Sequence, residues 1–152
     1  MFDWFRKRTP VIETPAFDSA PLQPETDLSR AQRDEFAPWR DPIEEDNHVQ
    51  VFLDRYPVTP GHRLYVPKWN SSYCLWHAFR AAEDHGEHLV RQGEIDGYNI
   101  GFNRGIAAGQ TVLYPHVHLI LRMSGDCADP TGGVRGVIPG QANYRGPDYK
   151  NP

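Results

Sequence analysis

Hydrophobic and polar positions along the chain follow two different patterns, which meet near residue 40. Five prolines interrupt every short periodic pattern in the first part: Pro10, Pro15, Pro21, Pro24 and Pro38. Residues 1–40 are therefore predicted to form an N-terminal arm that is either flexible or packed on a partner. Residues 41–145 show the periodicity of a folded domain, and residues 146–152 form a short C-terminal tail.

The domain opens with two segments whose alternation predicts paired strands. Val49, Val51 and Leu53 occupy alternate positions, which is typical of a strand with one buried face. A turn containing proline and glycine, over residues 56–62, leads to a second short strand at residues 64–66. The two strands are predicted to pair antiparallel.

Residues 71 to about 92 show the spacing of a helix. Leu75, Phe79 and Ala82 fall on one helical face, whereas Gly86 is expected to interrupt the helix. Further strands are predicted at residues 98–103 and 112–121, separated by a glycine-rich loop and followed by an irregular tail. This order predicts an α+β fold with an antiparallel β-sheet and one main helix.

Composition and charge narrow the functional classes. The 152 residues are 39% hydrophobic and 24% charged, as in an ordinary soluble enzyme. A net charge of −4 argues against a general binder of nucleic acids or anionic membranes. No apolar run approaches the roughly 18 residues of a membrane span, and the first ten residues lack the apolar core of a signal peptide. A cytoplasmic location is expected.

The two cysteines, Cys74 and Cys127, are far apart in the sequence and lack CxxC spacing. Two cysteines alone cannot build a zinc site. Two unpaired thiols in a reducing compartment are expected, with one disulfide as the alternative.

One segment concentrates side chains that suit phosphate chemistry. In the predicted final strand, alternate positions place Tyr114, His116 and His118 on one face. Backbone N–H groups of the preceding glycine-bearing loop can bind phosphate oxygens, and a neutral imidazole can attack phosphorus. The same histidines, with His62 as a third, are alternatively ligands for zinc. His85 and His88 are expected to lie on a solvated helix surface.

This segment resembles the active-site strand of the histidine triad (HIT) family of nucleotide hydrolases and transferases. Gly109 and Gln110 open the motif, His116 and His118 occupy two of its three alternating histidine positions, and Arg122 follows. Three other segments resemble the family in the same order: residues 52–68, 98–105 and 125–139. The last of these is similar to the tail of the bacterial diadenosine tetraphosphate hydrolase-like branch, and a HIT-like fold is implied.

The resemblance also implies roles. His116 matches the nucleophile that forms a nucleotidyl-histidine intermediate, His118 contacts the phosphate and assists the leaving group, and His62 lies beside them. Tyr114 replaces the first triad histidine, and a phenol with an ordinary pKa of about 10 carries no positive charge. The implied nucleotide-binding residues are Asp54 at the ribose, Phe52 and Leu53 at the nucleoside, and Asn103, Gln110 and Thr111 near the α-phosphate.

The implied activity is attack on the α-phosphate of purine nucleotide derivatives, such as dinucleoside polyphosphates and nucleoside phosphoramidates, without a metal or other cofactor. Arg135 in the tail is either a polyphosphate contact or part of a turn. The alternative function is a catalytically weak, nucleotide-binding regulatory module, which Tyr114 favours and the retained histidines oppose.

The expected partners are a purine nucleotide and a second copy of the chain, not nucleic acid or membrane. The stretch between Lys68 and Gly97 is short for the family and is predicted to hold one helix. Family dimers often use this region, so the oligomeric state stays open.

Overall fold

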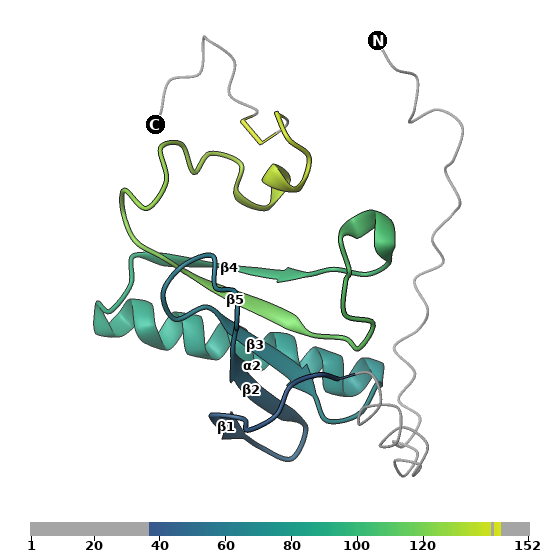
Figure 1. Ribbon diagram of the computed structural model, residues 1–152. Helices are drawn as coiled ribbons and strands as arrows, with labels where there is room; N and C mark the ends of the chain where they lie inside the picture. The colour runs from purple at the N-terminus through teal and green to yellow at the C-terminus, as the bar shows by residue number, and fades with distance from the viewer. Residues whose placement is uncertain (1–36, 141, 144–152) are drawn as a thin grey trace, which may run out of the picture.

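The computed structural model describes residues 37–140, 142 and 143, and a five-stranded antiparallel sheet organises them (Figure 1). The strands are β1 (Glu44–Glu45), β2 (Val49–Leu53), β3 (Arg63–Pro67), β4 (Gly97–Phe102) and β5 (Val117–Arg122). Their spatial order is β1-β2-β3-β5-β4, so β1 and β4 form the edges. One long helix, α2 (Ser72–Gln92), lies along one face of the sheet. Two 3₁₀ turns, η1 (Ile106–Ala108) and η2 (Gly133–Val137), follow β4 and β5 respectively. The predicted α+β fold with one main helix is confirmed.

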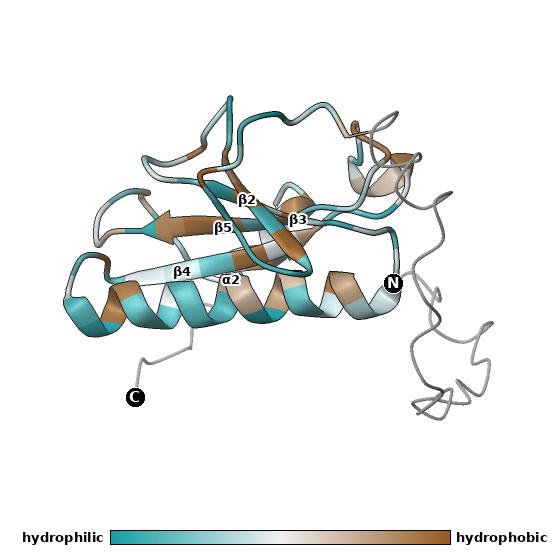
Figure 2. Ribbon diagram, turned by 90° about the horizontal axis from the view of Figure 1, so that it is seen from below, coloured by the Kyte–Doolittle hydropathy of each residue, from teal (hydrophilic) through white to brown (hydrophobic). Residues whose placement is uncertain are grey.

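Helix α2 is uninterrupted and packs close to the sheet through small side chains. Its buried residues form a stripe of Cys74, Ala78, Ala82, Gly86 and Leu89. The predicted break at Gly86 is wrong, because glycine here serves close packing: a Cβ atom would lie 2.8 Å from ring atoms of Tyr98. The buried face of α2 also differs from the predicted one, because Leu75 is only partly buried beside the core and Phe79 is 36% exposed. Figure 2 shows hydrophilic and hydrophobic bands alternating along α2.

The strand pattern places apolar residues on both faces of the sheet. On the helix face, the buried cluster includes Val49, Val51, Tyr65, Val117 and Leu119. The opposite face carries a second buried cluster of Ala37, Phe52, Leu64, Val66 and Tyr114. β2 and β3 pair antiparallel, as predicted.

The final strand is shorter than predicted. β5 begins at Val117, whereas residues 111–116 are irregular. The Gln110 side chain hydrogen-bonds to the backbone on both sides of it and so holds this segment in an irregular conformation. Its Oε1 accepts from the Gly105 amide at 2.7 Å, and its Nε2 donates to the Leu113 carbonyl at 2.9 Å. Pro115 has no N–H to contribute to a ladder. From Val117 onward the prediction holds, since Val117 and Leu119 face α2.

The tail after β5 is fixed to the sheet at its start and then turns back across it. Arg122 donates from Nε and Nη2 to the Asp126 carboxylate and from Nη1 to Asn99 Oδ1 on β4. Gly132 has a φ of +85° and lies against the Ala142 carbonyl, where a Cβ atom would clash. The tail therefore contains one short ordered turn, η2, which contacts β4 on the face opposite α2 (Figure 1). Within the described part of the chain, no helix is long and apolar enough to cross a membrane.

The predicted domain limits stay predictions. Residues 1–36, which make up most of the predicted arm, and residues 144–152 lie outside the described part.

Candidate active site

The face of the sheet opposite α2 brings four of the predicted residues to one cavity of about 720 Å³. Asp54, His62, Asn103 and His118 all line it. Asp54 and His62 come from the connection between β2 and β3, Asn103 directly follows β4, and His118 lies on β5 opposite Gly101. Because a Cβ atom on Gly101 would meet no atom within 4 Å, the space beside His118 remains open.

Asp54, His62 and His118 form a chain of polar contacts along one wall. The buried His62 places Nε2 at 3.0 Å from His118 Nδ1. Its Nδ1 lies 3.4 Å from Asp54 Oδ2 and also 3.4 Å from the amide nitrogen of Val58. His118 Nε2 is buried and makes no hydrogen bond to the described residues. The chain therefore ends in a polar atom that a ligand can satisfy.

His116 is buried beside this chain, and its neighbours fix its tautomer. Its Nδ1 donates to the Tyr114 carbonyl at 2.8 Å, because a carbonyl oxygen can only accept. The lone pair of the neutral ring is therefore on Nε2. The ring centroid lies 5.0 Å from that of His118 and 4.8 Å from that of Trp39.

Burial keeps the three imidazoles neutral. It is the largest cause lowering the pKa of His62 and of His116 below the ordinary 6.5, in each case against the opposing charge of Asp54. The pKa of His118 falls to about 4, because burial acts together with repulsion from His116 and His62. Neutral imidazoles offer both lone pairs and N–H groups to a phosphate.

Six predicted residues lie outside the cavity lining, and one of them is His116, whose ring is beside that of the lining residue His118. Tyr114 is 2% exposed, and its hydroxyl donates to the Pro67 carbonyl at 2.9 Å. Phe52 packs in the same buried cluster. Leu53 is 55% exposed, Thr111 is exposed, and Gln110 braces its own loop. These side chains are available to shape the site rather than to line the cavity.

The cavity also has residues that sequence reasoning did not assign. Gly133, Val134 and Val137 of η2 form its far wall. The signal for them in the sequence is the tail motif, in which Arg135 alone is a predicted contact. The ring of Trp39 packs at a tilt against those of His116 and Phe52, although Trp39 lies within the predicted arm.

The donor set can hold a metal ion, with a different third ligand from the one predicted. Ligand atoms of Asp54, His62 and His118 lie within 4.8 Å of one another. Two imidazoles and a carboxylate are ligands that zinc accepts. Asp54, rather than His116, completes this group.

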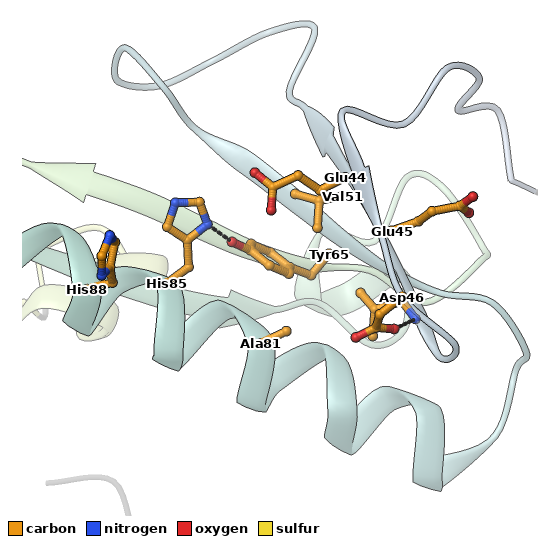
Figure 3. A pocket seen from close by; sticks show the side chains of 9 residues that line it. Glu44, Glu45, Asp46, Val51, Tyr65, Ala81, His85 and His88 are labelled. Atoms are coloured by element: carbon orange, nitrogen blue, oxygen red, sulfur yellow. Dashed lines mark hydrogen bonds between the residues drawn. The ribbon is translucent and has the colours of Figure 1, made fainter.

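A second hollow, of about 480 Å³, lies on the α2 side of the sheet, where the predicted active-site residues are absent from its lining (Figure 3). His85 and His88 of α2 line it together with Glu44 and Tyr65. His85 Nδ1 and the Tyr65 hydroxyl are 2.6 Å apart, so His85 provides a hydrogen-bond partner for a phenol that is 1% exposed. His85 is thus half-buried and ties helix to sheet, whereas His88 is exposed as expected.

Comparison with known proteins identifies the family. Residues 40–125, more than half of the 152-residue chain, match the HIT domain model, so the chain belongs to the HIT domain family. An uncharacterized HIT-like protein of Methanocaldococcus jannaschii is 38% identical over 91 residues, which cover 55% of this chain and 70% of that protein. The adenylylsulfatase HINT3 of Arabidopsis thaliana is 27% identical over 95 residues, or 55% of this chain and 46% of that protein.

A solved structure supports the same assignment. The crystal structure of a zinc-bound histidine triad family protein from Mycobacterium smegmatis superposes with a TM-score of 0.55 at 25% identity, covering 68% of this chain and 82% of that one. The family consists generally of nucleotide hydrolases and transferases, and this chain is of that nucleotide-binding kind. The diadenosine tetraphosphate hydrolase-like branch stays a prediction.

Proposed function

We propose that this protein hydrolyses or transfers nucleotidyl groups, and that His116 attacks the α-phosphate of a purine nucleotide derivative. The tautomer of His116 is the observation that carries the proposal. Its Nδ1 proton is held by the Tyr114 carbonyl, so Nε2 keeps its lone pair, and burial holds the ring neutral near pH 7. A neutral, oriented imidazole is a competent nucleophile toward phosphorus.

The reaction has two displacements. In the first, a bond forms between His116 Nε2 and the α-phosphorus while the bond to the leaving group breaks. In the second, water attacks the same phosphorus, the bond to His116 breaks, and a nucleoside monophosphate is released; another acceptor in place of water makes the protein a transferase. The Asn103 amide and the N–H groups of the loop after β4 stabilise charge on the phosphate oxygens.

His118 is the proposed proton donor to the leaving group. The His62–His118 hydrogen bond has two proton arrangements, because His62 Nδ1 lies beside both a carboxylate and an amide N–H. When His62 Nδ1 donates to Asp54, its Nε2 accepts from His118 Nδ1–H, and His118 Nε2 can then take up a proton together with the anionic substrate. The imidazolium formed in this way passes its Nε2 proton to the departing atom on phosphorus, and His118 returns to the neutral ring.

The nucleoside is proposed to bind near the end of β2. Asp54 Oδ1 already accepts from the Tyr56 amide at 2.8 Å, which holds the carboxylate at the mouth of the cavity. A carboxylate in that position can accept hydrogen bonds from two ribose hydroxyls. Leu53, with 55% of its surface exposed, offers apolar contact to the base.

A homodimer in the cytoplasm is the proposed form of the protein. β4 is an edge strand, and the exposed Trp76 and Phe79 lie on α2 beside it, around a shallow hollow of about 380 Å³. An edge strand with adjoining apolar side chains suits pairing with a second copy. Cys74 and Cys127 form no disulfide within the described part of the chain, as a reducing compartment favours.

The decisive experiment is capture of the nucleotidyl-histidine. The protein is mixed with adenosine 5′-phosphoramidate, quenched in base and digested, and the peptide containing His116 is examined by mass spectrometry. The expected result is a mass increase of one adenylyl group that is lost on brief acid treatment. His116→Ala should give no adduct, whereas His88→Ala, a matched change on the α2 side, should give the same adduct as the unchanged protein. Turnover without any adduct on His116 would overturn the proposal.

A further inference from the structure

A tryptophan that precedes the first strand packs against the proposed nucleophile. The ring centroid of Trp39 lies 4.8 Å from that of His116, at an interplanar angle of 57°. The same side chain packs against Phe52, with ring centroids 6.3 Å apart, and borders the buried cluster that contains Phe52 and Tyr114. Trp39 therefore connects His116 to the buried cluster on the face opposite α2, although it belongs to none of the strands.

The backbone on both sides of Trp39 is also fixed. Arg40 Nη1 donates to the carbonyl of Ala37 at 2.7 Å and to that of Trp39 itself at 2.8 Å. Ala37 is 5% exposed and belongs to the same buried cluster. Residues 37–40 thus form a short segment that is tied at each end, and this segment holds the Trp39 ring next to His116.

The hydrogen bond of His116 leaves the faces of its ring to be fixed by packing. Its Nδ1 donates to the Tyr114 carbonyl, which fixes one edge of the imidazole. Two rings pack against it, those of His118 at 5.0 Å and Trp39 at 4.8 Å. His118 is proposed to gain and lose a proton during the reaction, whereas the indole of Trp39 has no group that titrates near pH 7. Trp39 is therefore the ring contact whose charge stays constant through both displacements.

Trp39 also contributes to the burial of His116. The imidazole is 8% exposed, and burial is the largest cause that lowers its pKa below 6.5. Removing the indole would admit water to the ring, stabilise the imidazolium and so raise the pKa toward its ordinary value. Since only the neutral ring can attack, activity would then be lost at a higher pH as the solution is acidified.

We propose that Trp39 is a positioning residue for His116, and that the segment 37–40 holds the imidazole through this contact in the orientation used for attack. The inference rests on the proposed nucleotidyl transfer to His116. In the step concerned, the bond from His116 Nε2 to the α-phosphorus forms while the bond to the leaving group breaks, and Trp39 takes up no proton and makes no bond. Its contribution is orientation, because a misplacement of about 1 Å can cost about 10²-fold in rate.

The test measures kcat, KM and the pH dependence of kcat/KM on adenosine 5′-phosphoramidate, with the full chain and its variants. Trp39→Ala should lower kcat about tenfold and move the acid limb of kcat/KM to higher pH, while KM changes less than kcat. Trp39→Phe keeps an aromatic ring and should recover most of the loss. Tyr73→Ala, which removes a 37%-exposed ring on α2, is the matched control and should leave kcat and the pH profile unchanged.

Arg40→Met extends the test to the backbone of the segment. It removes both hydrogen bonds to the carbonyls without changing the indole, and Arg40 itself is exposed. We expect a smaller fall in kcat, about threefold, with a shift of the acid limb in the same direction. Unchanged kcat and an unchanged pH profile in Arg40→Met would overturn the proposal, also where Trp39→Ala does not fold.

The contrary outcomes separate this proposal from the proposed function. If Trp39→Ala weakens AMP binding and raises KM while kcat and the pH profile stay the same, Trp39 contacts the nucleoside and its positioning role is overturned. If the adenylyl adduct on His116 forms at the same rate in all variants, the positioning role is overturned and the proposed function stands. If the unchanged protein binds AMP but gives neither turnover nor adduct, the proposed function is overturned and the positioning role with it.

Discussion

The two faces of the sheet differ in role: one packs against α2 and stabilises the fold, and the other carries the candidate active site. On the α2 face, small helix residues let the backbone approach the sheet closely, and Val117 and Leu119 are 0% exposed. On the other face, the residue between them, His118, lines a cavity with Asp54 and His62. Alternation along β5 thus assigns neighbouring residues to different tasks, so substitutions one position apart should affect different properties.

The open face is itself divided. Near β2 and β3 it is closed by a buried cluster that contains Ala37 and Tyr114, with Trp39 packed against it. Near β4 this face forms a cavity, and η2 makes up the far wall of that cavity. His116 lies at the boundary, where it contacts Trp39 on the packed side and His118 on the hollow side. This position holds the His116 ring in place next to a residue that lines the cavity, as a positioned nucleophile requires.

The largest expected effect is the loss of turnover in His116→Ala. Removing the nucleophile should lower kcat by about 10³-fold or more, equivalent to roughly 4 kcal/mol of transition-state stabilisation. AMP affinity, measured by calorimetry, should remain mostly intact. Val117→Ala, one position along and facing α2, should show the reverse: a lower unfolding midpoint and normal kcat for the folded fraction. Comparable activity in the histidine variant would remove His116 from the mechanism.

Asp54→Ala is expected to weaken ribonucleotide binding more than the binding of 2′,3′-dideoxynucleotides. A hydrogen bond to a charged acceptor contributes about 1.5–3 kcal/mol, which corresponds to roughly ten- to hundredfold in Kd. The comparison requires Kd values for AMP and 2′,3′-dideoxyAMP with both proteins. Equal weakening of the two ligands would show that Asp54 does not recognise the ribose.

Gly86→Ala tests the close packing on the helix face. Alanine gains about 1 kcal/mol of helix propensity over glycine, but its Cβ atom would lie 2.8 Å from the Tyr98 ring. Overpacking of this kind costs about 1–3 kcal/mol, so we expect a net loss in the free energy of unfolding of up to about 2 kcal/mol. Urea denaturation measures it. Gly97→Ala, where a Cβ atom meets nothing within 4 Å, is the control, and equal midpoints for the two variants would contradict the packing argument.

Local patterns in the sequence predicted much of the fold, because alternation and helical spacing depend on neighbouring residues alone. β2, β3 and the span of α2 follow from these patterns. The start of β5 does not follow from them, because it depends on hydrogen bonds from the Gln110 side chain to the backbone on both sides of it. Gly86 was misjudged because its role depends on Tyr98, a residue on another element.

The site shows the same limit. Alternation placed His116 near His118, but His62 and His118 are 56 positions apart and no spacing rule joins them. That pairing followed only from the resemblance to the HIT family. The wall formed by η2 was predicted only through one alternative for Arg135, a polyphosphate contact, because its position depends on Arg122 reaching Asn99 across the sheet. The parts of the site that local patterns did not predict are therefore formed by contacts between segments far apart in the sequence.

Tyr114→Phe should have a smaller effect, because Tyr114 belongs to the packed half of the open face. Its hydroxyl donates to the Pro67 carbonyl, so its removal leaves a buried acceptor unpaired at a cost of about 1–3 kcal/mol in stability. Turnover should fall by no more than about tenfold, or roughly 1.4 kcal/mol. Parallel measurements of kcat and the unfolding midpoint separate the two effects. A drop in kcat far beyond tenfold at unchanged stability would assign the phenol a direct part in catalysis.

Chelation should have the smallest effect on activity. The proposed mechanism takes its nucleophile from His116 and its proton from His118, and both operate without a Lewis acid. A metal ion held by Asp54, His62 and His118 would instead occupy the nitrogen atoms through which the proton is relayed. We therefore expect kcat/KM to survive excess EDTA, and added zinc to inhibit in competition with substrate. Metal analysis of the purified protein by mass spectrometry accompanies the assay. Stoichiometric zinc, together with activity that is lost on chelation and restored by zinc, would show that the hollow half of this face is a metal centre and that the proton relay is wrong.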